Sequence, residues 1–320
     1  MKKYIFLASA VVALAACSSN EEIEQIGKCE IKLSSTLEVQ TRAAQGIQST
    51  EFDQGQRVDV FINEDTDEEA SIKYDQPLYY TTGANGVLNP PSTQYFPQNG
   101  NGVNIIGLYP SGLTTDVEAT NVSFSVQSNQ SDSASYKASD LMIGTPVGNN
   151  PVARTTSSIA LKFKHYLSKI NINITAGDGL TTNDLVGAEV TILGITNSAT
   201  FNVQTGVVTL DKQPASSTIT AGTLAKRQDN GEIAGISAIV IPQEVTAGSQ
   251  FISIKIGGDQ QTAPTELVYT LPKAASMTFN PGYSYTFNIT AKKSGLSVNS
   301  SSISQWEDGG STNGEAIPMP

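Results

Sequence analysis

The chain has 320 residues, and Asp and Glu outnumber Lys and Arg, which gives a formal net charge of −11. Because nothing in so acidic a chain would neutralise a row of phosphates, the charge excludes an extended nucleic-acid surface, and we expect no nucleic-acid partner. Charged residues make up only 15% of the sequence, and small polar and β-branched residues are abundant. This composition is typical of short strands joined by polar turns, and it predicts an all-β protein.

The first 17 residues have the pattern of a bacterial lipoprotein signal. Two lysines follow the first Met, an apolar run occupies residues 4–14, and two alanines precede Cys17. A positive start, an apolar run and a small-residue cleavage site direct export, and the run is too short to cross a bilayer, which takes about 20 apolar residues. We interpret residues 1–17 as a signal peptide ending at a lipidated Cys17, with an ordinary signal peptide as the alternative.

A polar, acidic stretch after Cys17 predicts a flexible tether. Apolar and polar residues then alternate over residues 29–40, which predicts a half-buried β-strand or a pair of short strands. The apolar residues of this alternation are Cys29, Ile31, Leu33, Leu37 and Val39. The strand ends at Thr41 and Arg42, so that Arg42 lies between a strand and a polar segment that continues to Gln56.

Short strands follow at close spacing, separated by clusters of Gly, Asn and Pro that predict turns. In the first half they are expected at residues 57–62, 78–81, 103–109 and 121–127. No segment there has the 3.6-residue period of a helix, so this half is predicted to be all-β. The acidic loop at residues 65–69 lacks the spacing of an EF-hand, and we interpret it as a solvated loop.

A Gly- and Pro-containing segment at residues 144–158 is the expected domain boundary. Strands are expected beyond it at residues 159–163, 170–174, 186–195, 200–203, 207–210, 237–241, 251–256, 267–271 and 283–289. The length left after the signal suggests two domains, with one large sandwich as the alternative. We therefore predict two β-sandwiches, at residues 43–150 and 151–291.

Residues 292–320 continue past the last long strand. They carry the apolar side chains of Leu296, Val298, Ile303 and Trp306 among many serines and glycines. A sandwich domain that is already complete does not need such an extension to pair its strands. We interpret it as a segment whose apolar side chains alternate along the chain but which has no partner strand in its own domain. A frayed terminus is the alternative.

No residue pattern indicates catalysis, a cofactor or a metal. The single histidine, His165, lies between two expected strands without a serine or cysteine nucleophile motif, which favours a structural histidine. Phosphate-binding glycine loops are absent, and Cys29 is the only cysteine besides Cys17, so there is neither a disulfide framework nor a zinc ligand set. We predict that the protein is not an enzyme, although an all-β hydrolase with spatially paired carboxylates remains an alternative.

Four segments, in order, resemble the fimbrillin family, the type V pilins of Bacteroidales. The segments are residues 139–144, 161–170, 201–208 and 303–310. The pair Thr41-Arg42 also resembles the processing site of that family. The resemblance implies a lipoprotein precursor with two transthyretin-like Greek-key β-sandwiches in tandem, first held by its lipid at the surface of the cell outer membrane and later part of a fimbrium.

The resemblance further implies that a trypsin-like, arginine-specific protease cuts between Arg42 and Ala43. The cut removes the lipid together with residues 18–42, which comprise the tether and a propeptide strand. The side chains that leave the groove with this strand would be those of Ile31, Leu33, Leu37 and Val39.

In the same scheme, a strand from another subunit fills the open groove, which is a known mode of peptide binding. The candidate donor side chains are those of Leu296, Val298, Ile303 and Trp306. Copies of the chain, or related pilin subunits, would thereby polymerise into a fimbria that supports adhesion to a host or bacterial surface ligand. The alternative is a surface lipoprotein of the same fold that keeps its lipid and acts as a fimbrial anchor, a tip adhesin or a glycan-binding protein.

Overall fold

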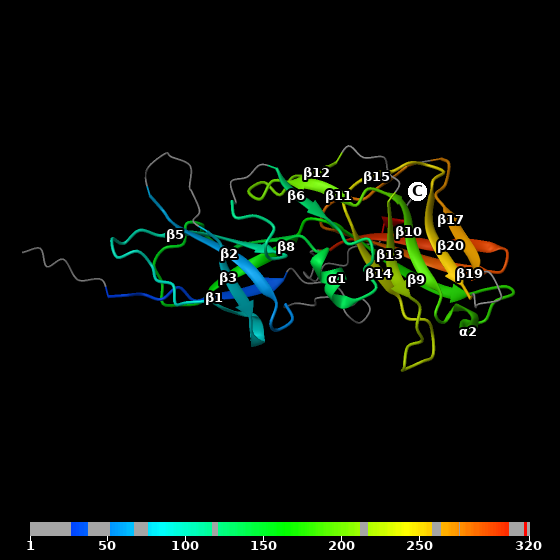
Figure 1. The fold of residues 1–320 in the computed structure, drawn as a ribbon, viewed down its shortest axis with the longest axis horizontal. Helices are drawn as coiled ribbons and strands as arrows, with labels where there is room; N and C mark the ends of the chain where they lie inside the picture. Colours follow the sequence, from blue (N-terminus) through cyan, green and yellow to red (C-terminus); the bar gives the residue numbers. More distant parts are fainter. Residues whose placement is uncertain are drawn as a thin grey trace, which may run out of the picture.

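The computed structural model describes the chain in segments. These are residues 27–37, 52–66, 76–116, 121–211, 217–257, 264–274, 276–306 and 317–318. The described part is all-β, as the composition predicts, and it forms an elongated molecule with the N-terminal strands toward one end and the C-terminal strands toward the other (Figure 1). Cys17, Val39, Arg42 and Ala43, on which the expected lipidation and processing depend, lie outside the described residues.

Seven strands form a closed barrel in the order β1-β4-β3-β2-β5-β7-β8. They are β1 (Leu33–Leu37), β2 (Arg57–Glu64), β3 (Leu78–Thr82), β4 (Val87–Asn89), β5 (Val103–Tyr109), β7 (Met142–Pro146) and β8 (Ile159–His165). Successive residues of a strand point to opposite faces, so β8 buries Leu161 and Phe163 while Lys164 is exposed. β1 closes the barrel because it pairs with β4 on one side and β8 on the other.

Phe163 packs into the barrel interior, where two glycines make room for its ring. A Cβ atom added at Gly107 of β5 or at Gly144 of β7 would lie 2.6 Å from the Cζ atom of Phe163. The ring of Phe163 also meets Phe52 edge-on, with the centroids 5.0 Å apart. A glycine inside a strand often marks such a close approach, and here it allows an aromatic side chain to fill the barrel.

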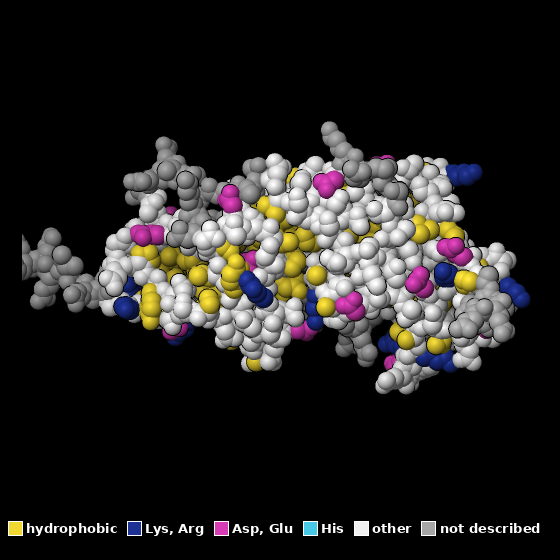
Figure 2. Space-filling model, in the orientation of Figure 1, with side chains coloured by type: hydrophobic (Ala, Val, Ile, Leu, Met, Phe, Trp, Pro, Cys, Tyr) yellow, Lys and Arg dark blue, Asp and Glu magenta, His cyan; other side chains and the backbone are white. Residues whose placement is uncertain are grey.

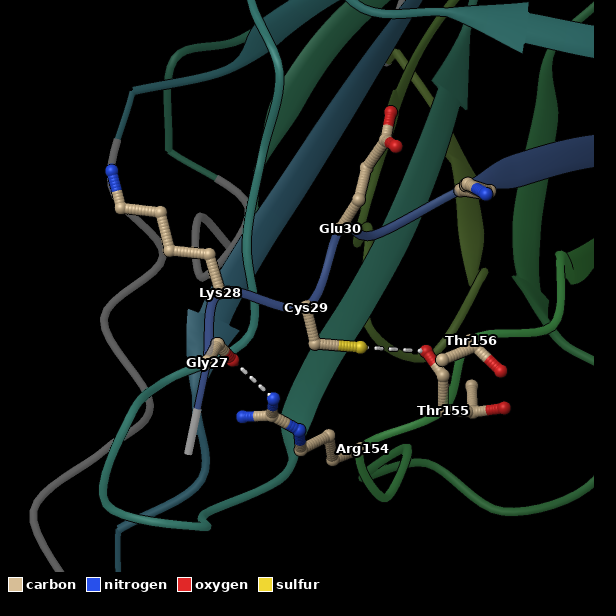
Figure 3. Close-up of a pocket in the computed structure, with 8 residues that line it drawn as sticks. Gly27, Lys28, Cys29, Glu30, Arg154, Thr155 and Thr156 are labelled. Carbon is tan, nitrogen blue, oxygen red and sulfur yellow. Dashed lines mark hydrogen bonds between the residues drawn. The ribbon is translucent and has the colours of Figure 1, made fainter. Parts of the chain in front are cut away.

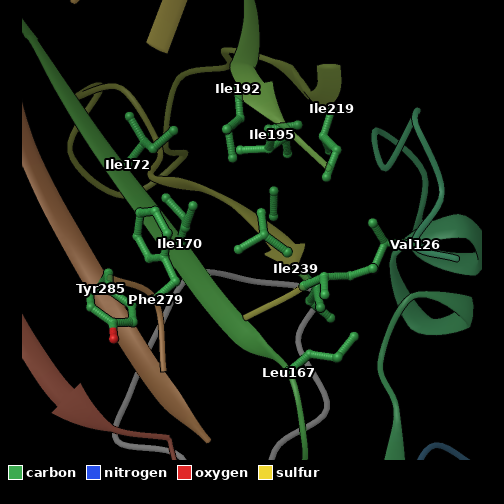
Figure 4. Close-up of a cluster of buried hydrophobic side chains, with 14 of the residues drawn as sticks. Val126, Leu167, Ile170, Ile172, Ile192, Ile195, Ile219, Ile239, Phe279 and Tyr285 are labelled. Carbon is green, nitrogen blue, oxygen red and sulfur yellow. The ribbon is translucent and has the colours of Figure 1, made fainter. Parts of the chain in front are cut away.

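The remaining strands form the second assembly. Its two larger sheets have the orders β13-β10-β16-β17 and β14-β9-β19-β20-β21, and its smaller sheets are β12-β11-β6 and β15-β18. The bounds are β6 (Val122–Ser125), β9 (Ser168–Ala176), β10 (Glu189–Ile195), β11 (Ser198–Phe201), β12 (Val208–Leu210), β13 (Ser217–Thr223), β14 (Ile236–Val240), β15 (Glu244–Val245), β16 (Gln250–Ile256), β17 (Thr265–Thr270), β18 (Met277–Thr278), β19 (Tyr283–Lys292), β20 (Gly295–Gln305) and β21 (Ile317–Pro318). Figure 4 shows part of their core, where Ile170 of β9 packs in one cluster with Ile192 of β10 and Ile239 of β14.

The division between the two assemblies differs from the expected boundary at residue 150. β8 follows that boundary, yet it pairs with β7 and β1 of the barrel. β6 precedes the boundary, yet it pairs with β11 and contributes Val122 and Phe124 to the core of the second assembly. The Pro and Gly residues after β7 therefore belong to a loop that joins two neighbouring strands of one barrel. All strands from β9 onward belong to the second assembly.

Helical segments are present although the sequence predicts none. They are the 3-10 turn η1 (Ala84–Gly86) and the helices α1 (Ser133–Ala138) and α2 (Thr182–Leu185). Each is too short to show an amphipathic period, and local capping stabilises the two α-helices. Asp132 accepts a hydrogen bond from the backbone N–H of Ser135, and Thr181 forms a capping box with Asp184.

Among the described residues, no helix is long and apolar enough to cross a bilayer. Figure 2 shows acidic and basic side chains dispersed over one face of the molecule, with hydrophobic side chains visible mainly over the barrel and the centre. This face therefore has no concentrated patch of one charge.

Candidate functional site

The first strand and the groove that holds it form the candidate site. All five residues of β1 pair in parallel with β8, from Leu33 opposite Ile159 to Leu37 opposite Phe163. On the other side, the start of β1 pairs antiparallel with β4. β1 is thus an interior strand of the barrel, and its removal would leave β4 and β8 as unpaired edges.

Alternate side chains of residues 29–37 point into the barrel. Their exposed fractions are 7% for Cys29, 2% for Ile31, 3% for Leu33, 2% for Ser35 and 3% for Leu37. The sequence predicts this alternation, and the structure adds Ser35 to the inward set. The four residues other than Ser35 belong to the barrel core, so this segment holds together the strands on either side of it.

Hydrogen bonds continue upstream of β1 to a cavity (Figure 3). The N–H of Ile31 donates a 2.8 Å hydrogen bond to the Gln94 oxygen. Beyond it, Cys29 Sγ donates to the Thr155 oxygen at 3.2 Å, and Arg154 Nη2 donates to the Gly27 oxygen. The cavity has a volume of about 610 Å³, and most of its lining belongs to the N-terminal segment. It is lined by Gly27, Lys28, Cys29, Glu30, Lys32, Arg154, Thr155 and Thr156.

Residues 38–51 connect β1 to the rest of the barrel, and Arg42 lies in this connection. Both ends of the connection meet the same residue of β8: Leu37 is the backbone partner of Phe163 in the parallel ladder, and the ring of Phe52 packs against that of Phe163. The connection is also the only covalent link between β1 and the strands that follow it. A cut after Arg42 would therefore leave β1 held by non-covalent contacts alone.

The C-terminal segment has a local partner, which corrects the expectation that it has none. β20 pairs antiparallel with β19 along its whole length, from Gly295 opposite Lys292 to Gln305 opposite Tyr283. A two-residue turn joins the two strands, which is the tightest hairpin connection. Leu296, Val298 and Ile303 are only partly buried against the second core. β20 and β1 belong to different sheets, so one copy of the chain does not bring the two candidate segments together.

Trp306 fixes the end of β20. Its side chain is 2% exposed and stacks on His165, with the ring centroids 4.0 Å apart and the planes at 6°. The backbone N–H of Trp306 donates a 2.6 Å hydrogen bond to the backbone oxygen of Gly282. His165 is the last residue of β8, so this stack joins the C-terminal strand to the strand that borders the β1 groove.

Charged groups are buried beside this stack. His165 Nδ1 lies 2.8 Å from Asp140 Oδ1, and Lys169 Nζ lies 5.9 Å from the centroid of the Trp306 ring. Burial lowers the pKa of Lys169 to about 8, against the opposing attraction of Asp140. Burial, with the charge of Asp140 as a second cause, raises the pKa of Tyr136 well above its ordinary value. His165, Asp140, Lys169 and Trp306 are each only 2% exposed.

The lowered pKa of Lys169 predicts a pH dependence of stability. Between pH 8 and the ordinary lysine value of 10.5, the unfolded chain binds more protons at this position than the folded chain. The free energy of unfolding therefore rises with pH across this window, by up to about 3 kcal/mol for this group. We expect the difference in unfolding free energy between the wild type and Lys169→Met to rise from pH 8 upward, as measured by urea denaturation. The tyrosines, which also titrate at high pH, are the same in both proteins and cancel in this difference. A difference in unfolding free energy that does not change with pH would contradict the expectation.

The structure therefore places the predicted residues in two separate regions. Ile31, Leu33 and Leu37 lie in the barrel, and the candidate donor residues lie in the second assembly. No group of three His, Cys, Asp or Glu side chains that could hold a metal ion occurs in the described part of the chain. Sequence reasoning missed Ser35, although it shares the parity of the apolar residues around it.

One family model matches most of the chain, and solved structures share its fold. Residues 41–306 match the sequence profile of a family described as fimbrillin-like, and residues 1–18 match a prokaryotic membrane lipoprotein lipid attachment site. A candidate cell adhesion protein from Bacteroides uniformis is 24% identical, with a TM-score of 0.61 over 87% of this chain and 98% of that chain. Another from Bacteroides ovatus is 16% identical, with a TM-score of 0.64 over the same shares. A search of curated proteins gives no match.

Proposed function

Because the chain belongs to the fimbrillin-like family, we propose that it is a structural pilin subunit of a cell-surface fimbria. In this proposal the chain is exported as a lipoprotein, held at the outer membrane surface by a lipid on Cys17, and cleaved after Arg42 by a trypsin-like protease. In the same proposal, the barrel and the second assembly correspond to two tandem transthyretin-like sandwiches. Subunits then polymerise by exchange of a strand, and the fimbria supports adhesion to a host or bacterial surface ligand.

The position of β1 carries the proposal. β1 is an integral strand of the barrel, yet it lies outside the family match, which begins at residue 41. The barrel formed by the matched residues of this chain is therefore incomplete without a strand that lies outside the match. A strand from another subunit is a binding partner that meets this need, because main-chain hydrogen bonds and alternate side chains provide affinity.

Loss of β1 would destabilise the barrel strongly. Besides Ser35, four buried side chains leave the core. Each aliphatic one that leaves takes away roughly 1.5 to 3 kcal/mol of stabilising free energy. Two edges with unpaired backbone groups open at the same time. The open barrel is thus a high-energy state, and occupation of the groove by another strand lowers its free energy.

Cleavage after Arg42 would change the competition for the groove. While residues 38–51 are intact, β1 rebinds as part of the same chain, at an effective concentration on the order of millimolar. Once the chain is cut, β1 dissociates as a separate peptide, and it competes with strands of other subunits without the advantage of its covalent link. The lipid leaves with it, which frees the subunit from the membrane.

We propose the C-terminal segment as the donor, with Leu296, Val298, Ile303 and Trp306 as its apolar residues. Support comes from the pairing of β20, because β19 pairs with it along its whole length while β21 pairs only with Ser302 and Ile303 on the other side. The side chains of β20 itself are partly buried or exposed, so it leaves its sheet at a smaller cost than a buried strand that is paired on both sides along its length. The stack of Trp306 on His165 has to open before β20 can leave β19.

Limited proteolysis of the purified chain tests the function. We expect an arginine-specific protease to release a species that begins at Ala43 and that assembles into ladders on denaturing gels without boiling. A lysine-specific protease is the matched control, because no lysine lies between residues 33 and 72. A species that begins at Ala43 and stays monomeric would overturn the polymerising role.

A lipid-retaining surface lipoprotein is the second candidate, because the closed barrel with β1 in place is a complete structure and the lipid attachment motif is present. Such a protein would serve as an anchor, a tip adhesin or a glycan-binding protein. Mass spectrometry of the form recovered from the cell surface separates the candidates. The pilin begins at Ala43, whereas the lipoprotein keeps a lipidated Cys17.

A further inference from the structure

One inward position of the segment 29–37 differs from the others. Four of these positions carry a cysteine or an aliphatic side chain, whereas the fifth carries Ser35, which is 2% exposed. Ser35 Oγ donates a 3.1 Å hydrogen bond to the backbone oxygen of Gly86. A buried hydroxyl therefore satisfies a buried carbonyl at this point of the groove.

Gly86 brings its backbone against that of β1. Its φ of +71° lies in the left-handed region, and a Cβ atom added to it would overlap the backbone oxygen of Ser35. The two backbones touch here, and the space beside them holds a hydroxymethyl group. A branched or longer side chain in place of Ser35 would meet the Gly86 carbonyl and leave its oxygen without a donor.

We propose that the Gly86 carbonyl forms a notch that admits a small hydroxyl side chain and sets the register of the strand in the groove. The inference rests on the proposed function, since it concerns the strand that replaces β1. Elsewhere the groove is apolar, so a slip by two residues would exchange one apolar contact for another. At the notch, the same slip brings Leu33 or Leu37 against Gly86, and this single mismatch excludes the wrong registers.

The notch selects one register for β20 of a second copy. Leu296, Val298 and Ser300 alternate in the order aliphatic, aliphatic, serine, which is the order of the inward residues over 31–35. No other serine of β20 follows two aliphatic residues of its own parity. Ser300 is exposed in its own sheet, so its transfer uncovers no core. The register therefore places Ser300 of a second copy at the Gly86 carbonyl.

This register also predicts a difference in affinity. It brings Ser302 of the second copy to the site that Leu37 fills in the uncut chain, and it places Ile303, which has the opposite parity, on the outer face of the strand. The loss of one buried leucine weakens binding by about 10- to 100-fold. The exchanged strand thus binds more weakly than β1 does, and it binds productively only after cleavage has removed β1.

Peptide binding to the full chain cleaved after Arg42 and separated from residues 1–42 tests the notch. The probes are fluorescent peptides of residues 28–40, read by fluorescence polarisation. We expect Ser35→Leu to weaken binding by about 100-fold, because it loses the hydrogen bond and clashes with Gly86. Thr36→Leu is the matched control, since Thr36 is exposed, and it should bind within about threefold of the unchanged peptide.

The outcomes separate the inference from the function on which it rests. If the unchanged 28–40 peptide does not bind, the groove does not accept a strand and the proposed function fails. If it binds and Ser35→Leu binds equally well, the notch is refuted while the function stands. A peptide of residues 293–305 tests the register: Ser300→Leu should abolish its binding and Ser301→Leu should not, and equal effects would overturn the assignment of Ser300.

Discussion

We expect Arg42→Ala to leave the chain uncut at residue 42 and to abolish assembly. The chain contains four arginines, and structure restrains the other three. Arg57 begins β2, Arg154 donates to the Gly27 oxygen, and Arg227 lies in a turn closed by its own N–H bond to the Glu232 oxygen at 2.7 Å. A protease binds an extended peptide, which disfavours a cut at these three arginines.

The measurement compares fimbriae and N-terminal residues of cells that express wild type and variant. Arg42→Ala should abolish ladders and keep the lipidated N-terminus, while Arg227→Ala, the matched control at another exposed arginine, should assemble as the wild type does. Normal processing and assembly of Arg42→Ala would refute both the cleavage site and the role assigned to β1. Loss of assembly in both variants would point to a defect in folding or export.

Phe163→Ala should lower the free energy of unfolding of the uncut chain by about 3 to 5 kcal/mol. Phe163 is fully buried and fills the space above Gly107 and Gly144, which have no side chains to refill it. The substitution also removes the aromatic contact with Phe52. Because glycine backbones cannot collapse into the gap, the cavity persists and the cost lies at the high end for such a deletion.

The single tryptophan is a convenient reporter for this measurement. Trp306 stacks on His165, two residues beyond Phe163 on the same strand, so its fluorescence follows the junction between the assemblies. Lys164→Ala is the control, since Lys164 is exposed on the outer face of β8, and it should change stability by less than about 0.5 kcal/mol. A loss below 1 kcal/mol for Phe163→Ala would mean that the barrel repacks around the gap.

Strands with strong alternation or β-branched runs were predictable from the sequence. The expected strand at residues 103–109 coincides with β5, and those at 57–62 and 251–256 fall within β2 and β16. The parity of Ile31, Leu33 and Leu37 also predicted that these side chains are buried in β1 and just before it. One buried face gives this segment a two-residue period, whereas β5 is buried on both faces and is marked by a mainly apolar run; both patterns can be read without knowing the partner strand.

Features that depend on distant partners could not be read in the same way. β20 is rich in serine because its side chains are half-buried or exposed. Apolar and polar residues therefore alternate only weakly along it, and only the turn at Lys293 and Ser294 marks the hairpin. The loop after β7 looks like a linker, although it joins two strands of one barrel. The importance of Ser35 depends on Gly86, 51 residues away, and no local pattern connects the two.

The placement of β1 between β4 and β8 has a mechanical consequence for a fibre built from such subunits. Interstrand hydrogen bonds run across the strands, so a pull along the axis of a strand in this groove loads the bonds to both neighbours together, in shear. In shear these hydrogen bonds must break together. If the strand were peeled from one end, they would break one after another. A joint of this kind withstands tension along the fibre far better than its small contact area suggests, and it yields more readily to a force that lifts one end of the strand.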